Sequence, residues 1–422
     1  MTVAIIFILL FVFMVLGVPI GVCLSLPLLI AVCIDPFTSM SFIGQVFYSG
    51  VASFTMLALP FFVLAGAVMD SGGLSRRLVR IANSLIGPIT GSLGLVAIIA
   101  CMFFGAVSGS APATVAAIGA IMIPEMIRAG YDKYYAVALI ATAGSLGVIV
   151  PPSYPMVIYG VTFNVSIGDL FIAGIGPAVV VGAILAVINY AYCKKHGYKG
   201  TQKLSIREFA LAVKDGFPAL LMPVIILGGI YGGVFSATEA AVVAVVYGIV
   251  VGKFWYRELT IRELFPMFRS NTIFVGGTML TLAPATALGT VLNILGVTSF
   301  VGNFFIGLTD NEYIVILVCV AILFIVGMFI QTTPVIVILG PILYAALEPY
   351  GMDPIQYGLF LVLALSIAFI TPPVAANLFM ASSMTGISIN RLTPQLIKFM
   401  IGLCIALFIV AVFPQVSLFL IS

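Results

Sequence analysis

Charged side chains are scarce in this chain: only 7% of its 422 residues are Asp, Glu, Lys or Arg, whereas 63% are hydrophobic. Soluble domains carry about 25% charged residues, so this composition excludes a soluble protein. Apolar runs of about 20 residues, the length that spans a bilayer, recur along the whole chain. We expect about nine to twelve of them, and therefore predict an all-α polytopic membrane protein.

Histidine is nearly absent, and this limits the chemistry available inside the membrane. The one histidine, His196, lies in a lysine-rich loop, so Ser108 has no histidine at membrane depth to act as its general base. No GxxxxGK[ST] phosphate loop occurs, which argues against ATP hydrolysis. The shortage of Asp, Glu and His in the apolar segments also disfavours a proton relay. We therefore predict a protein that is not an enzyme and has no organic cofactor.

Glu239 is the acidic residue that most needs an explanation, because it lies close to apolar sequence. The spacing Ser236-x-x-Glu239 predicts a capping box that opens the following helix. A proton or sodium relay remains the alternative. The six cysteines are scattered without CxxC spacing, and we expect them to pack as small apolar residues.

Basic residues are distributed unevenly between the loops. They gather around residues 76–80, 128–133, 194–207 and 253–269, whereas the loops around residues 165–169, 232–237, 296–312 and 348–353 contain no Lys or Arg. The positive-inside rule places the first group in the cytoplasm and the second outside.

Four polar, proline-marked interruptions break the apolar runs, and they form two similar pairs. Residues 107–114 (VSGSAPAT) and 150–155 (VPPSYP) make the first pair, and residues 330–336 (IQTTPVI) and 370–374 (ITPPV) make the second. The spacing from Pro112 to Pro334 is nearly the same as that from Pro151 to Pro372. Non-helical backbone at membrane depth is tolerated where it is buried in protein or lines a wet cavity. Two breaks per half at matching positions are typical of secondary transporters with a substrate site between the repeats.

The loop charges predict that the two halves have opposite orientations. The flanks of residues 107–114 are basic, whereas those of residues 330–336 are acidic, so we predict an inverted-topology repeat over residues 51–177 and 273–400. Two re-entrant helical hairpins explain this pattern, as do two pairs of full crossings; the short polar tips favour hairpins. Residues 150–155 and 370–374 would then break two transmembrane helices.

The remaining sequence is expected to provide scaffold. Residues 1–50 are predicted to form an N-terminal transmembrane helix, within residues 4–34, and a connecting segment. Residues 178–272 would hold linking scaffold helices with basic cytoplasmic loops, and residues 401–422 a C-terminal transmembrane helix.

The breaks have a predictable chemistry. Proline pairs remove amide donors and leave earlier carbonyls unpaired, around residues 147–149 and 367–369. Such oxygens, with nearby Ser and Thr hydroxyls, suit a hard monovalent cation. The helices that start near Ala111 and Val335 would direct their positive N-termini toward the polar tips, which suits a carboxylate. We therefore expect sodium and anion sites in one crevice, with Asn377, one turn after a break, as a further candidate.

Four motifs in order resemble one known family. Residues 104–114 (FGAVSGSAPAT), 147–153 (GVIVPPS), 232–240 (GGVFSATEA) and 371–374 (TPPV) are similar to the large membrane subunit of TRAP (tripartite ATP-independent periplasmic) transporters, the DctM-like group, and the whole chain is most similar to its sialic-acid branch. One departure is Ser236-Ala237, where the family usually has Thr-Pro.

The resemblance implies a fold of the ion-transporter-superfamily elevator type in the bacterial inner membrane. It implies sodium-coupled import of a carboxylate solute, N-acetylneuraminate first, using two or more sodium ions. The expected partners are a four-helix small (Q-type) membrane subunit and a periplasmic substrate-binding (P-type) protein. The alternatives are a stand-alone sodium-coupled dicarboxylate or organic-anion transporter, a passive channel and a scaffolding subunit.

Site residues also follow from the resemblance. The implied sodium ligands are Ser108, Ser110, Gly144, Gly147 and Pro151 for one site and Gly327, Thr332, Thr333, Thr371 and Met380 (through its carbonyl) for another. The implied substrate contacts are Ser110, Pro112, Thr114, Pro152, Thr332, Pro334, Pro373 and Asn377.

Overall fold

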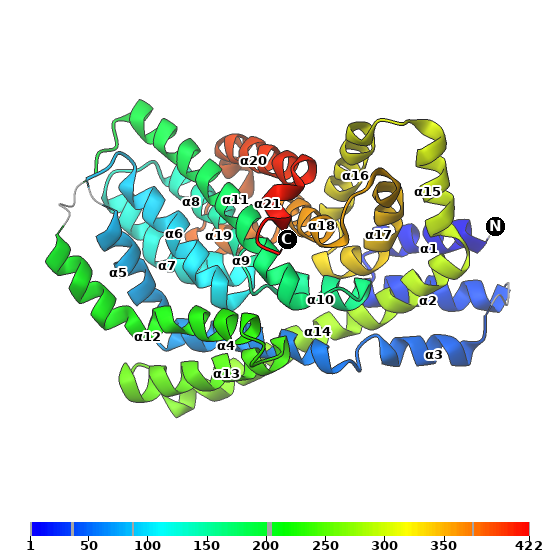
Figure 1. The fold of residues 1–422 in the computed structure, drawn as a ribbon, viewed down its shortest axis with the longest axis horizontal. Coiled ribbons are helices and arrows are strands. Elements are labelled where there is room, and N and C mark those ends of the chain that lie inside the picture. Colours follow the sequence, from blue (N-terminus) through cyan, green and yellow to red (C-terminus); the bar gives the residue numbers. More distant parts are fainter. Residues whose placement is uncertain (1, 35–37, 87, 201–204, 374, 422) are drawn as a thin grey trace.

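The structure, a computed structural model, describes residues 2–34, 38–86, 88–200, 205–373 and 375–421, so Val374 and the basic-loop residues 201–204 lie outside it. All regular secondary structure in these ranges is helical (Figure 1). Nine helical stretches within them are long and apolar enough to span a bilayer, and several shorter apolar helices accompany them. The prediction of an all-helical polytopic protein is therefore confirmed.

The first apolar segment differs from the expectation of a single helix over residues 4–34. It forms α1 (Thr2–Val15) and α2 (Ile20–Ile34), which pack against each other. Gly17 takes a left-handed backbone with φ of +73°, and the Val18 amide donates to Phe13 O at 3.1 Å, which closes the end of α1. Pro19 then precedes the new helix. The expected single helix is wrong because glycine and proline together turn the chain.

The two halves of the chain follow the same order of helices, with α8 and α9 together corresponding to α18. The first half contains α4 (Ala58–Ser71), α5 (Leu74–Leu85), α6 (Ser92–Ser108), α7 (Ala111–Arg128), α8 (Lys133–Ala143), α9 (Leu146–Ile149), α10 (Tyr154–Phe163) and α11 (Ile167–His196). The second contains α14 (Ile261–Ile294), α15 (Val297–Leu308), α16 (Glu312–Gly327), α17 (Thr332–Leu347), α18 (Pro354–Ala368), α19 (Ala376–Thr385) and α20 (Ile389–Val412). Helices α10 and α19 have the same length. The first residue of α19 follows the first residue of α10 by the same number of positions as Pro334 follows Pro112, and the same holds for their last residues.

The other helices are α3 (Met40–Ser49), α12 (Ile206–Tyr231), α13 (Ala237–Val250) and α21 (Pro414–Leu418), with short turns η1 (Phe54–Leu57), η2 (Val251–Trp255) and η3 (Glu348–Tyr350). The boundaries expected at residues 177/178, 272/273 and 400/401 fall inside α11, α14 and α20. Each of these helices therefore continues from one expected segment into the next.

Near the breaks, each half of the chain packs against the other half. Helix α10 packs on α17, and its counterpart α19 packs on α7, so the second part of each broken helix lies against the hairpin of the other half. Helices α6 and α9 pack together, as do α16 and α18. In the most apolar part of the stretch Lys133–Phe163, 94% of the residues are buried, as expected for helices that are apolar on all sides. The first break therefore lies in the protein interior.

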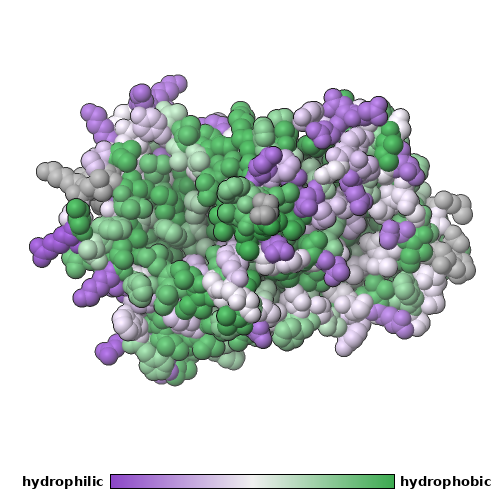
Figure 2. All heavy atoms as spheres, in the orientation of Figure 1, coloured by the Kyte–Doolittle hydropathy of each residue, from purple (hydrophilic) through white to green (hydrophobic). Residues whose placement is uncertain are grey.

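The outer surface is apolar over wide areas. Large side chains such as Phe11, Leu280 and Phe300 are exposed, and apolar residues cover much of the face shown in Figure 2. Exposed apolar surface of this extent fits contact with lipid. Glu239 belongs to the surface: its side chain accepts from the Ser236 amide at 2.7 Å while its own amide donates to Ser236 Oγ, so the predicted capping box is confirmed.

Two of the loops without Lys or Arg are in contact. The Tyr350 hydroxyl of the loop at 348–353 donates to Thr309 O of the loop at 296–312, at 2.6 Å. This contact joins two loops that the charge pattern predicts to share a side of the membrane. Nearby, the Tyr159 hydroxyl of α10 donates to Pro354 O at 2.5 Å.

Arg77 organises part of the basic face. Its guanidinium donates to Gly73 O and to Glu258 Oε1, both at 2.8 Å, and lies 3.6 Å from the centroid of the Tyr256 ring. Asp215 Oδ1 is 3.7 Å from Arg77 Nε. One largely buried guanidinium thus links α5, α12 and the connection before α14.

We expect Arg77→Met to lower the apparent thermal midpoint of the purified protein, because it removes two charge-assisted hydrogen bonds and the ring contact, about 1–3 kcal/mol in total. Arg76→Met is the matched control: Arg76 also pairs with Glu258, at 2.7 Å, but its side chain is 67% exposed. Exposed pairs contribute about 0–1 kcal/mol, so its midpoint should hardly change. Equal midpoints for the two variants would contradict this assignment.

Candidate functional site

The tip of the first hairpin is a compact, buried hydroxyl cluster. Helix α6 ends at Ser108, Gly109 turns the chain with φ of +57°, and Ser110 precedes α7. Thr114 Oγ1 donates to Ser110 O at 2.8 Å, so in its 3.2 Å contact with Ser108 Oγ it accepts and Ser108 donates. Both hydroxyl protons are used inside the cluster. The oxygens are left with lone pairs, which suits a cation.

The first break lies directly against this tip. A Cβ atom on Gly147 would lie 2.2 Å from Thr114 Oγ1 and 2.6 Å from Ser110 O. A Cβ atom on Gly109 would lie 3.0 Å from Pro152 O. Only glycine at position 147 lets the two backbones approach this closely. The structure therefore brings together Ser108, Ser110, Thr114, Gly147 and Pro152, and Gly144 lies nearby against Val115 of α7.

The first break also leaves carbonyl oxygens unpaired, as its proline pair predicts. The Val150 amide donates to Leu146 O at 2.8 Å, and the next two residues, Pro151 and Pro152, have no amide hydrogen. Among the described residues, no donor reaches the carbonyls of residues 147–149. Unpaired carbonyls beside acceptor-only hydroxyls form an oxygen-rich environment of the kind that hard cations bind.

The second break differs, and the expectation of freed carbonyls there is wrong. Ile367 O accepts from Thr371 Oγ1 at 2.8 Å and from the Ile370 amide at 3.0 Å. Phe369 O accepts from the Asn377 amide at 3.0 Å. A threonine hydroxyl and the start of α19 thus replace the donors that the prolines remove, so this break is self-satisfied.

Asn377 links the two broken helices. Its side chain is fully buried, and Nδ2 donates to Ala141 O at 3.0 Å and to Ser145 Oγ at 3.2 Å. Ser145 Oγ in turn donates to Ser366 O at 3.2 Å, whereas Asn377 Oδ1 has no partner among the described residues. Sequence reasoning missed Ser145 and Ser366, although they occupy equivalent positions in the two halves, like Pro151 and Pro372.

The residues assigned to the second sodium site are less closely grouped. Thr332 and Thr333 are buried at the start of α17, and the Tyr154 side chain of α10 lies beside Thr332. A Cβ on Gly327 would lie 2.7 Å from Ala368 Cβ, which places α16 against the end of α18. Met380 lies on α19, which packs on α7 and α8, and its carbonyl already accepts from Ser383 Oγ. The structure thus groups Met380 with the first hairpin.

The remaining assigned substrate positions lie around the breaks and tips. Pro112 lies in the first turn of α7, and Pro334 is buried in the first turn of α17. Pro373 is exposed. Ser153 was missed by sequence reasoning: its hydroxyl is buried without a partner among the described residues, and its Cα lies 3.3 Å from where a Cβ of Gly109 would be. Its position in the second half holds Ala375, so the repeat gave no signal.

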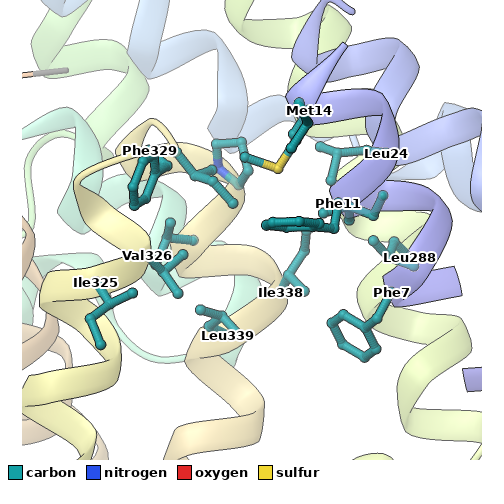
Figure 3. Close-up of a pocket in the computed structure, with 15 residues that line it drawn as sticks. Phe7, Phe11, Met14, Leu24, Leu288, Ile325, Val326, Phe329, Ile338 and Leu339 are labelled. Atoms are coloured by element: carbon teal, nitrogen blue, oxygen red, sulfur yellow. The ribbon is translucent and has the colours of Figure 1, made fainter. Parts of the chain in front are cut away.

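An apolar pocket of about 680 Å³ lies behind the second tip, between α1, α2, α14, α16 and α17 (Figure 3). Phe7, Phe11 and Met14 face Val326 and Phe329 across it, and Pro334 is one of the residues that line it. None of its lining side chains can donate a hydrogen bond, so it offers no partner for a carboxylate.

Within the described residues, no cluster of three or more His, Cys, Asp or Glu could hold a metal ion. The oxygen donors at the first tip are hydroxyls and carbonyls, so they fit a monovalent hard cation better than a transition metal.

A helical bundle with two proline-broken helices, each packed against a helix of the other half, is typical of membrane transporters. The chain belongs to the DctM component family of tripartite ATP-independent periplasmic transporters, whose family description matches residues 7–416. The family resemblance read from the four sequence motifs is therefore confirmed.

Relatives match over most of the chain. It is 38% identical over 408 residues to the isethionate TRAP transporter permease protein DctMQ of Oleidesulfovibrio alaskensis, covering 96% of this chain and 64% of that protein. It is 36% identical over 404 residues to the sialic acid TRAP transporter large permease protein SiaM of Vibrio cholerae, covering 96% and 95%. It is 36% identical over 365 residues to the C4-dicarboxylate TRAP transporter large permease protein DctM of Pseudomonas aeruginosa, covering 86% of each. The chain thus spans less than two thirds of the first relative.

Among solved structures, the YdaH transporter of Alcanivorax borkumensis aligns with a TM-score of 0.59 at 16% identity, covering 90% of both chains. At this identity, the similarity shows a shared fold and carries no information about the substrate.

Proposed function

We propose that this chain is the permease subunit of a sodium-coupled importer of an organic acid anion. The observation that carries the proposal is the oxygen cluster at the first tip. There, Ser108 and Thr114 have used their protons internally, and the carbonyls of residues 147–149 have no donor among the described residues. Such a site attracts a cation, and coupling follows when bound cation and anion stabilise the same closed arrangement.

In this proposal, sodium binds between the first tip and the first break, at Ser108, Ser110, Gly144, Gly147 and Pro151. A bound cation would hold α6 and α9 together and offset the lone-pair repulsion between the facing oxygens. The second set, Gly327, Thr332, Thr333, Thr371 and Met380, remains a predicted second site. We give the first set priority because its tip and break are in contact and the carbonyls of residues 147–149 have no donor among the described residues.

The anion is proposed to bind beside the cation. Helix α7 begins next to the tip, with Pro112 in its first turn, and its positive end faces the cluster. Thr332 and Pro334 at the start of α17 offer a second helix N-terminus. A carboxylate placed between them would also lie near Pro152, and the predicted contacts Pro373 and Asn377 belong to the second break.

The negative charge of the solute follows from chemistry shared by the relatives. Their names mention isethionate, sialic acid and C4-dicarboxylate, all of which carry an anionic group at neutral pH. We propose a carboxylate solute, with N-acetylneuraminate tested first, delivered by a periplasmic binding protein to a complex with a small membrane subunit in the inner membrane of a bacterium.

We further propose that α6–α7 and α16–α17 are re-entrant hairpins of an inverted repeat that moves as an elevator. Burial of the first tip supports this, because Ser108 is 1% exposed and the chain turns inside the protein. Because α10 packs on α17 and α19 packs on α7, the two halves would move together as one body.

The test is uptake of radiolabelled N-acetylneuraminate, succinate and isethionate into proteoliposomes that hold this chain with its small subunit. Each solute is offered with and without the binding protein and an inward sodium gradient. Uptake of one solute that needs both additions is the expected result. Sodium-dependent uptake without the binding protein would establish the stand-alone transporter instead, and uptake that ignores sodium would overturn the coupling.

A further inference from the structure

A polar cavity of about 720 Å³ lies between α3, α10, α14 and α17. Glu348, at the end of α17, lies at its mouth, and Asn293, near the end of α14, lines its wall. Both belong to the face whose loops contain no Lys or Arg. The cavity is separate from the hydroxyl cluster of the first hairpin, and its lining is more polar than that of the 680 Å³ pocket.

Three threonine hydroxyl groups that line this cavity present lone pairs. Thr286 Oγ1 donates to Leu282 O at 3.0 Å, and Thr290 Oγ1 donates to Thr286 O at 2.8 Å. Across the cavity, Thr162 Oγ1 donates to Ile158 O at 2.8 Å. Each hydroxyl has one proton, and here each proton is used within the same helix. These oxygens can therefore only accept, which suits a cation or the protons of its water shell.

The charge of the lining also favours a cation. Glu348 carries the only full charge among the described lining side chains, and none of them is basic. A carboxylate at the mouth of a cavity with low-dielectric walls raises the local concentration of cations and lowers that of anions. Since a water molecule occupies about 30 Å³, the cavity has room for a hydrated monovalent ion.

Helix α10 runs between the cavity and the second hairpin tip. Helix α10 lines the cavity at Phe163 and begins at Tyr154, beside Thr332 of the tip. Its ten residues span about 15 Å. Helix α17 packs along α10 and covers the same distance, and α14 closes the far wall, with Val337 O 3.0 Å from where a Cβ of Gly289 would lie.

We propose that this cavity is a cation vestibule: it collects the coupling cation on the face opposite the basic loops, one length of α10 away from the second tip. The inference rests on the sodium coupling proposed above and adds the place where the ion first enters the protein. Glu348 supplies the attraction, and the threonine oxygens replace part of the water shell.

The test uses the complete transporter in proteoliposomes and measures the sodium concentration that gives half-maximal uptake. At low ionic strength, Glu348→Gln should raise this concentration about 2–5-fold, because it removes the attracting charge without changing shape. Added choline chloride should abolish the difference between variant and wild type by screening. Thr290→Val, which replaces the accepting oxygen by a methyl group, should raise it at any ionic strength. Asp310→Asn, which neutralises an exposed carboxylate on the same face but outside the cavity, is the matched control.

The outcomes separate this inference from the proposed function. Wild-type uptake that does not depend on sodium overturns the proposed function, and the vestibule with it. If wild-type uptake depends on sodium but Glu348→Gln and Thr290→Val both have the wild-type half-maximal sodium concentration, the vestibule alone is overturned. A Glu348→Gln variant that instead lowers the KM for the solute anion would make the cavity the solute entrance and would also overturn the vestibule.

Discussion

Gly147→Ala is expected to reduce sodium-driven uptake by about 100-fold or more. The added methyl group would lie 2.2 Å from Thr114 Oγ1 and 2.6 Å from Ser110 O, so tip and break must separate by about 1 Å, and displacements of that size in a site typically cost about 100-fold in rate. The separation would also widen the cation site. We therefore expect the increase in thermal midpoint that sodium gives the wild-type protein to disappear in this variant.

The control for this prediction is Gly276→Ala in α14, where no atom lies within 4 Å of the added Cβ. Alanine in an open helical position is favourable, so this variant should transport like wild type. Thr114→Val complements the pair, because valine keeps the shape of threonine but removes the oxygen. It should fold normally and lose the sodium-induced midpoint shift. A Gly147→Ala protein with wild-type uptake and sodium response would show that the cation binds elsewhere.

Much of the architecture is predictable from the spacing of prolines and polar residues. The matching spacings of Pro112 with Pro334 and of Pro151 with Pro372 predict two similar halves, and the helices α10 and α19 keep that spacing at both ends. The signal is strong because non-helical backbone inside a membrane needs protein or water around it, so breaks of this kind are rare and informative.

The sequence is less informative where a local substitute exists for a missing donor. Proline pairs occur at both breaks, yet only the first leaves its carbonyls unpaired within the described residues, since Thr371 and the Asn377 amide satisfy those of the second. Whether a side chain reaches back to a carbonyl depends on the path of the chain after the prolines. The turn at Gly17 is marked in the sequence only by Gly17 and Pro19, because no polar residue interrupts the apolar run there.

Asn377→Leu is expected to destabilise the fold and to reduce uptake at least about tenfold. Ala141 O would normally accept from the Ser145 amide one turn later, but that amide donates to Thr142 O at 2.9 Å, so Asn377 Nδ2 supplies the missing donor. Leucine fills the space and leaves a buried carbonyl without a partner, which costs about 1–3 kcal/mol. The variant should show a lower thermal midpoint in detergent and slower uptake at saturating sodium.

The matched control is Asn164→Gly. Asn164 ends α10 in the left-handed region with φ of +53°, and Gly386 ends α19 in the same way with φ of +69°. Glycine adopts this backbone without strain, so Asn164→Gly should keep wild-type stability and uptake. Asn377 differs because its side-chain amide joins α19 to α8. The two broken helices must keep their relative positions if the bound cation and anion are to stabilise the same arrangement. If Asn377→Leu were as stable and active as Asn164→Gly, the link between the broken helices would be dispensable, and the hairpin contacts of α7 and α17 would have to hold the halves together alone.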